Sequence, residues 1–476
     1  MTGAAGLSLT RVQTASLAAG LLGAAAIGAG ATVAPAMTVI GSAALVVIAI
    51  SAIRPAYGAC FLLGVTPLIA GLERGGAIPL LRPYEALGLL VGLGIVVRLV
   101  VAGRDVDFHF ERLDLAILLM AVASSIYPLF VMKLRSQDIQ QEDVLYAFQL
   151  WKYYGVFLIM RFSIRTRRQV RAALLTAVLA ATVMGTIALL QSLRIAGVDG
   201  LIYQFFPPNS ENANSASRGR GTTTVGSAIG AADVTTYCFA VAAAWSLTMR
   251  DRPRLMPALA FVLVLGALGS GQFSGFIGLF VAAVAVGIVT RRLGRFALAF
   301  SPAVLVGAVL LQPVIDKRLE PLQRGVLPQS WEVRLDNLER FFWPRLSEDL
   351  NWLTWARPQA RVPSPPGWPS GEWVYIESGH TWLLWTGGLF FLLAFFWFLW
   401  VALRRFWQIA QSRTDESGVA ARGAFVAVTT IGVLMFTDPH LSFRASSDMS
   451  FSLMGIAIGG ASWRAARAGP SPPGPP

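Results

Sequence analysis

One uncharged stretch sets the fold class: residues 273–290 read Phe-Ser-Gly-Phe-Ile-Gly-Leu-Phe-Val-Ala-Ala-Val-Ala-Val-Gly-Ile-Val-Thr, and Arg291 and Arg292 follow at once. A helix that crosses a bilayer needs about 20 mostly apolar residues. Similar stretches recur along the 476-residue chain, which is 55% hydrophobic and only 14% charged. Because an average globular chain is roughly a quarter charged, these values exclude a soluble protein. We predict an all-α, polytopic integral membrane protein.

The apolar stretches number fourteen, and we predict about 14 (12–14) membrane-spanning helices, because only Pro35 and Arg54-Pro55 separate the first three. They lie near residues 14–34, 36–53, 55–72, 83–103, 113–132, 144–163, 170–190, 226–249, 255–269, 273–290, 296–313, 381–402, 423–440 and 447–463.

The distribution of basic residues predicts the orientation. With the N-terminus inside, 22 of the 39 Lys and Arg residues fall in cytoplasmic segments and eight fall in short outer connections. Lys and Arg in short loops favour the cytoplasmic side, so both termini are predicted to be cytoplasmic. The formal net charge of +13 then reflects topology, and nucleic-acid binding is not needed to explain it.

The Cys and His residues argue against a metal centre. Cys60 and Cys238 both lie in apolar stretches, and His109, His380 and His440 are widely separated. This spacing fits neither a disulfide framework nor a thiolate or histidine metal site. Motifs of soluble enzymes, such as a P-loop or G-x-S-x-G, are also missing from the sequence.

Two outer segments are longer than ordinary connections: residues 191–225 and, between the eleventh and twelfth predicted spans, residues 314–378. Loops of such length are usually functional or disordered. The first contains Arg218-Gly-Arg220-Gly-Thr-Thr-Thr224. Two guanidinium groups on a Gly-rich turn with exposed backbone N–H groups suit phosphate oxygens. The alternative is a pair of solvated Arg side chains at a helix end.

The second outer segment contains an amphipathic pattern over Trp331–Trp343. Read as a helix, it places Trp331, Leu335, Leu338 and Phe342 on one stripe. We expect this helix to lie on the membrane surface, with Arg334 at the lipid boundary and Arg340 facing water. An ordinary surface Arg at position 334 is the alternative.

His380 stands where this outer segment re-enters the membrane, in Glu377-Ser-Gly-His380-Thr-Trp. A neutral imidazole accepts a proton near pH 7, so His380 is a candidate general base. Glu377, one helical turn earlier, could orient the ring. The alternative is an interfacial His that is satisfied by the backbone.

Taken in this order, these segments resemble the O-antigen ligase and O-antigen polymerase superfamily of bacterial polytopic glycosyltransferases. The resemblance rests on the Arg-Gly-Thr segment, on Arg334 early in the long loop, and on His380-Thr-Trp-Leu with Gly387-Gly-Leu-Phe, and covers about residues 140–400. It implies a catalytic membrane region (141–403) that includes both outer loops, between N-terminal membrane helices (1–140) and C-terminal membrane helices (404–463). The Pro-rich composition of the remaining residues predicts a disordered tail (464–476).

The resemblance also implies a function. The donor would be an oligosaccharide on undecaprenyl diphosphate, the acceptor a glycan or glycolipid, and the reaction would take place on the outer face of the bacterial cytoplasmic membrane. It implies no metal or nucleotide cofactor, and a flippase and a chain-length regulator as partners.

Residues and resemblance together predict one mechanism. Arg220 or Arg218, with Arg334, would bind the diphosphate and stabilise the leaving charge. His380 would deprotonate the acceptor hydroxyl for direct displacement, which predicts an inverting transferase. Polymerase and ligase differ only in the acceptor, and the number of spans slightly favours a polymerase.

Lys152 and Asp233 fall near the middle of predicted spans, where an unpaired charge is costly. We expect either a structural ion pair between them or a place for Lys152 on the entry path of the polyprenyl diphosphate. Mid-membrane charges are also typical of transport pathways, so a flippase or other secondary transporter is the alternative from a different class.

Overall fold

The computed structural model describes residues 35–75, 80–102, 109–207, 219–249, 251, 253–323, 325, 329–354, 357–365 and 373–467. Within these ranges, eight helices are long and apolar enough to cross a membrane, and three shorter apolar helices accompany them. The chain is a polytopic, all-α membrane protein. The first predicted span, 14–34, lies outside the described residues.

The other predicted spans each coincide with one helix or with two consecutive helices. These are α2 (Pro35–Ile53), α3 (Pro55–Ile69), α4 (Pro83–Ala102), α5 (Arg112–Ser124) with α6 (Ile126–Leu134), α7 (Gln141–Ala147) with α8 (Gln149–Ser163), α9 (Arg167–Ser192), α12 (Ala228–Thr248), α13 (Met256–Gly269), α14 (Phe273–Thr290), α15 (Leu293–Leu310), α20 (Gly379–Ser412), α21 (Glu416–Leu434) and α22 (Ser446–Arg467).

Several boundaries differ from the prediction. The stretch 113–132 breaks at Ser125, whose backbone leaves the helical region (φ −129°, ψ −79°). The predicted span 423–440 ends early, because α21 stops at Leu434 and a turn follows. The α22 helix continues to Arg467, into the segment expected to be disordered, and residues 468–476 lie outside the described residues.

Helix α12 forms the centre of the bundle. It packs against α9, α13, α14 and α21, and nearly all of its side chains are buried. Its sequence is rich in Ala and Thr, and small side chains allow helices to approach closely. Asp233 therefore lies in the interior of the protein and not on a lipid-facing surface.

The segment between α15 and α20 folds into a small unit that we call the cap, residues 329–377. It follows α16 (Gln312–Gln323). It comprises α17 (Gln329–Asn337), the π-helical turn Leu338–Phe342, α18 (Trp343–Ser347), the 3₁₀ turn Glu348–Leu350, α19 (Asn351–Thr354) and an antiparallel hairpin of β1 (Arg361–Pro363) and β2 (Trp373–Tyr375).

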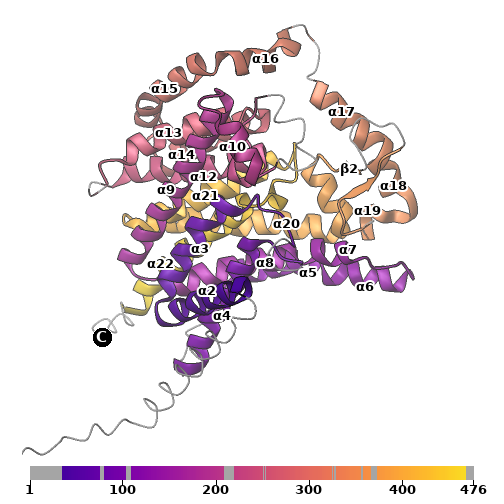
Figure 1. Cartoon of the computed structure of the whole chain (residues 1–476), viewed down its shortest axis with the longest axis horizontal. Helices are drawn as coiled ribbons and strands as arrows, with labels where there is room; N and C mark the ends of the chain where they lie inside the picture. Colours follow the sequence, from indigo (N-terminus) through magenta and orange to yellow (C-terminus); the bar gives the residue numbers. More distant parts are fainter. Residues whose placement is uncertain are drawn as a thin grey trace, which may run out of the picture.

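The cap lies over one side of the helix bundle, next to α6 and α7 (Figure 1). Two polar contacts attach it there: Arg357 makes a two-pronged pair with Asp143 of α7 at 2.8 and 2.9 Å, and Arg135 donates to Asn351 at 2.8 Å. The pairing with Asp143 outweighs the other influences on Arg357 and raises its pKa above the ordinary value. These two contacts join the described part of the cap to α7 and to the end of α6.

The helix expected over Trp331–Trp343 is present, but its second half is not a regular α-helix. A π-helical turn at Leu338–Phe342 inserts an extra residue and shifts the phase of the helix. Leu338 and Phe342 are buried as expected, whereas Trp331 and Leu335 are exposed. Phe342 packs edge-on against Trp385, with ring centroids 5.0 Å apart, which joins the cap to α20.

Helix α20 contains a kink at a residue where only glycine fits. Gly388 has a positive φ of 64°, and a Cβ at this position would collide with the carbonyl oxygen of Leu353 in the cap. Glycine adopts such backbone angles without steric cost. Gly388 therefore lets α19 pack directly on α20.

Candidate functional site

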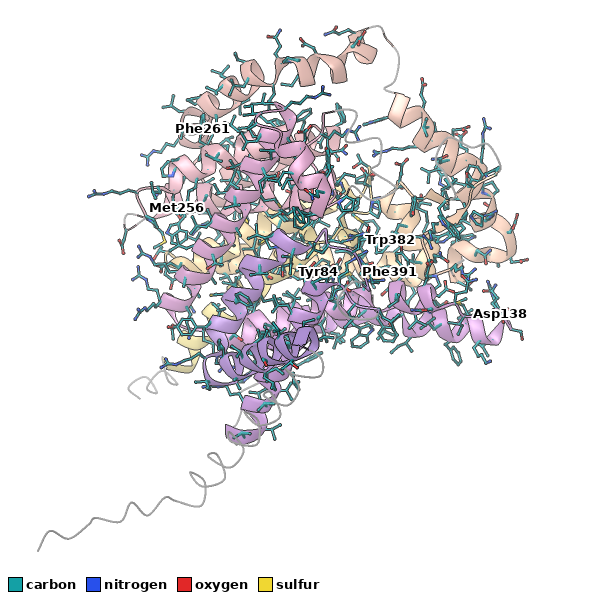
Figure 2. The ribbon with its side chains drawn as sticks, in the orientation of Figure 1. Tyr84, Asp138, Met256, Phe261, Trp382 and Phe391 are labelled. Atoms are coloured by element: carbon teal, nitrogen blue, oxygen red, sulfur yellow. The ribbon has the colours of Figure 1, made fainter. Side chains whose placement is uncertain are left out.

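A cavity of about 1630 Å³ lies between α3, α4, α8, α22 and the cap. Tyr84 of α4 and Trp382 of α20 both line it, and Figure 2 shows them near the middle of the molecule. Seven basic and four acidic side chains contribute to its wall: Arg74, Arg82, Lys152, Arg220, Arg334, Arg361, Arg444, Glu85, Glu377, Asp438 and Asp448.

The remaining wall is mainly apolar, and it comes from α3, α4 and α8. Its members include Leu62, Leu63, Leu89, Leu93, Val96, Leu99, Val156, Ile159 and Phe162. One cavity therefore joins an excess of positive charge to a long apolar surface. This combination suits an amphiphile with an anionic head and a hydrocarbon tail.

Arg334 contributes to the charged part from α17. Its Nη2 lies 3.0 Å from Oδ1 of Asp438, in the turn after α21, and its Nε lies 3.7 Å from Glu377. Burial alone would lower the pKa of Arg334, but the charges of Asp438 and Glu377 outweigh it and raise the pKa above its ordinary value. The guanidinium therefore stays charged.

The Arg334 side chain lines the cavity. Its expected position at the lipid boundary stays a prediction. Arg340 does lie on the outside of the cap, where it is exposed and pairs with Asp336 one turn earlier. Arg340 is thus exposed, as predicted, whereas Arg334 is mostly buried.

Arg220 enters the cavity from a segment that is packed into the bundle. Residues 222–225 are almost fully buried, and Gly221 packs so tightly on Ala188 of α9 that a Cβ would collide with its backbone. The N–H groups of Gly221 and Thr223 donate to Gly269 and Gln191 at 3.3 and 2.8 Å. These two N–H groups are thus not open to phosphate, contrary to expectation. Arg218 lies outside the described residues.

Lys152 of α8 also lines the cavity, but its partners are not the expected ones. Its Nζ lies 3.5 Å from Asp448 and 4.0 Å from Glu85, and it donates to the hydroxyl of Tyr84 at 3.1 Å. The predicted ion pair between Lys152 and Asp233 is wrong. Lys152 and Asp233 were expected at similar depth in the membrane, but their side chains point to different partners.

Asp233 instead forms a buried network with the turn between α21 and α22. Its Oδ2 lies 2.8 Å from Nδ1 of His440 and accepts from the hydroxyl of Ser446 at 2.8 Å. His440 and Ser446 are both fully buried. The network fixes the turn that also carries Asp438, so it positions a carboxylate beside Arg334.

His380 lies close in the chain to two residues that line the cavity, Glu377 and Trp382. It is the second residue of α20, and its ring packs against Phe436, with centroids 4.4 Å apart, and contacts the Met435 backbone. Among the described residues, the cavity wall includes Glu377 and Trp382, on either side of His380 in the chain, but not His380 itself. Glu377 contacts Arg334. The neighbours of the His380 ring are Phe436 and the backbone of Met435.

The structure thus brings Arg220, Arg334, Glu377 and Lys152 to one cavity, whereas His380 is not among the described residues that line it. Sequence reasoning missed Asp438, Asp448, Glu85 and Arg361. The sequence did contain a signal for Arg74, Arg82 and Arg444. They belong to the eight basic residues in short predicted outer connections, where Lys and Arg are unfavoured. Four of those eight line the cavity.

In the described part of the chain, no group of three or more His, Cys, Asp or Glu side chains is arranged to hold a metal ion. Comparison of the sequence with known protein families and with curated proteins finds no match. The chemistry of the cavity is therefore the basis for a functional assignment.

Proposed function

We propose that this chain is a membrane glycosyltransferase. It moves an oligosaccharide from undecaprenyl diphosphate to an acceptor sugar hydroxyl on the outer face of the bacterial cytoplasmic membrane. The observation that supports this most is the joining of a basic cluster to an apolar surface in one cavity. A polyprenyl diphosphate has the same two parts, because its diphosphate is anionic and its isoprenoid chain is apolar.

In this proposal, Arg220 and Arg334 bind the diphosphate. Asp438 and Glu377 hold the Arg334 guanidinium in its place before the lipid arrives. A planar guanidinium donates two parallel hydrogen bonds to phosphate oxygens, and its charge stabilises the diphosphate as it leaves. Lys152, which also lines the cavity, is assigned to the entry path of the lipid.

His380 is the proposed general base. It would take the proton of the acceptor hydroxyl while the oxygen attacks the anomeric carbon and the diphosphate departs, so the configuration inverts. Catalytic contacts are often loose before substrate binds, and in this proposal the His380 ring reaches the acceptor hydroxyl only in the substrate-bound state. Glu377, which already lines the cavity, is the alternative base.

The assay that tests the function uses purified protein and lipid-linked oligosaccharide, with and without lipid A-core. A polymerase, which we favour, extends the lipid-linked glycan into a ladder without lipid A-core. A ligase produces a product only when lipid A-core is present. No glycan transfer under either condition would contradict the proposal.

A lipid-linked substrate could also be moved across the membrane instead of being used there. The Lys152, Glu85 and Asp448 cluster favours this second candidate, a flippase, because charged groups in a membrane interior are typical of transport pathways. The two functions separate with His380→Ala. A transferase loses glycan transfer although the protein still inserts, whereas a transporter continues to translocate the lipid.

The orientation belongs to the same proposal: the cap and the charged end of the cavity face outward, and both termini face the cytoplasm. A Cys introduced at Ser364 should react with an impermeant thiol reagent in intact cells, and a Cys introduced at Arg292 should not. Labelling at position 292 alone would reverse the arrangement.

A further inference from the structure

The hairpin of the cap has two chemically different faces. Val362 and Val374 are register partners, and both are buried in the core of the cap. Because successive side chains of a strand alternate between its two faces, Trp373 and Tyr375 share the opposite face. Arg361, the register partner of Tyr375, lies on that face too.

All three residues of this second face line the cavity. The guanidinium carbon of Arg361 lies 4.0 Å from the centre of the Trp373 ring, and the same Arg361 side chain pairs with Glu142 of α7. Gln359, next to the hairpin, also donates to Glu142, at 2.6 Å. The Arg361 side chain is therefore held between the Trp373 ring of the hairpin and Glu142 of α7.

The residues of this face lie at different distances from Arg334. The strand β2 runs from Trp373 to Tyr375, and two residues later the chain reaches Glu377, 3.7 Å from Arg334. The pairing continues past β2, because the N–H of Ile376 donates to Ala360. Alternate positions of an extended chain lie about 7 Å apart, so Tyr375 and then Trp373 stand at increasing distances from the proposed diphosphate site.

We propose that this face, formed by Arg361, Trp373 and Tyr375, is a binding subsite for the sugars attached to the diphosphate. The inference rests on the proposed function. The flat, C–H-rich side of a pyranose packs against an aromatic ring, and its hydroxyls hydrogen-bond to a guanidinium group such as that of Arg361. The subsite extends the site from the lipid and its diphosphate to the glycan.

Two lipids of matched tail test the proposal on the full-length protein: undecaprenyl diphosphate without sugar, and the polyprenyl-diphosphate-linked oligosaccharide extracted from the cells that express this chain. We expect Trp373→Ala to weaken binding of the second lipid about tenfold, as expected for the loss of one aromatic contact. Binding of undecaprenyl diphosphate should change less than about twofold.

Two further variants control for damage to the cap. Trp373→Phe keeps an aromatic face and should retain most of the affinity for the glycan-bearing lipid. Trp352→Ala removes an exposed Trp of α19 that is not part of the cavity wall, and it should change the affinity for neither lipid.

Each other outcome contradicts the subsite in a distinct way. Equal weakening of both lipids by Trp373→Ala, or no effect on either, would overturn it while the proposed function stands. If Trp373→Ala weakened binding only of the oligosaccharide released from its lipid, the face would hold an acceptor glycan and our assignment would be wrong. Failure of the wild-type protein to bind either lipid would overturn both proposals.

Discussion

His380 and His440 both border turns near the cavity, but their surroundings differ. His440, in the turn between α21 and α22, is fully buried, and its Nδ1 lies 2.8 Å from the carboxylate of Asp233. His380, at the start of α20, is partly exposed, and its neighbours are the aromatic ring of Phe436 and the backbone of Met435.

Of the two, His440 has the geometry that is familiar from catalytic triads, in which a carboxylate orients the imidazole. A base must also reach its substrate, and the described residues of the cavity wall do not include His440. Asp438, two positions earlier, does line the cavity and contacts Arg334. One turn therefore serves two purposes: His440 fixes it to Asp233 in the protein interior, and Asp438 contributes to the site.

The largest expected effect in this comparison belongs to His380. His380→Ala should lower the rate of glycan transfer about 10²–10⁴-fold, the usual cost of losing a general base, while undecaprenyl diphosphate still binds. The measurement is initial rate with the purified protein in detergent or nanodiscs. Activity should also fall at acid pH, because a protonated imidazole cannot accept the acceptor's proton.

Two variants sharpen this result. Glu377→Gln should be milder than His380→Ala. His109→Ala should be neutral, because the variant keeps the backbone carbonyl that accepts from Arg161 and the described residues of the cavity wall do not include His109. If Glu377→Gln were the more severe change and His380→Ala kept wild-type rates, the base would be Glu377.

A smaller effect is expected at Arg334. Arg334→Ala should reduce transfer by roughly 10- to 100-fold, because a charge-assisted contact to the diphosphate is lost. Arg334→Lys should remain impaired, since an ammonium group does not reproduce the two-pronged contact. Arg340→Ala, on the exposed side of the cap, is the matched control and should keep near wild-type rates. Equal loss at both positions would indicate damage to the cap and not to a diphosphate site.

Much of the membrane fold could be predicted from the sequence, because long apolar stretches become helices wherever they lie in the chain. The extent of α14, residues 273–290, was predicted without error. Contacts between side chains of different helices were harder to predict from the sequence. Lys152 and Asp233 were expected to pair because they lie at similar depth, yet rotation of α8 and α12 gives them different partners.

The candidate site shows the same limit. Arg220, Arg334 and Glu377 were predicted from their own segments, and each lines the cavity. Asp438 could not be found, because the apolar stretch 423–440 hides the early end of α21 at Leu434. The hairpin was equally hidden, because its strands of three residues carry too short an alternation to stand out in a loop rich in Pro and Trp.

The smallest effect on activity is expected for Asp233. Asp233→Ala leaves His440 and Ser446 without their shared partner in the protein interior, which should lower the free energy of unfolding by about 1–3 kcal/mol. The lower Tm is measured by thermal unfolding in detergent. The molecules that remain folded should keep most of their transfer rate. Asp251→Ala, at an exposed carboxylate, is the control for stability. Loss of transfer at unchanged Tm would make Asp233 and His440 the catalytic pair.

The central claim is that the cavity binds a polyprenyl diphosphate with Arg220 and Arg334 at its head. The most direct test compares the affinities of undecaprenyl diphosphate and undecaprenol for the wild-type protein and for the double variant Arg220→Ala/Arg334→Ala. We predict that the wild-type protein prefers the diphosphate by at least about 100-fold, consistent with two charge-assisted contacts, and that the double variant loses this preference. Equal affinity of the wild-type protein for both lipids would contradict the account.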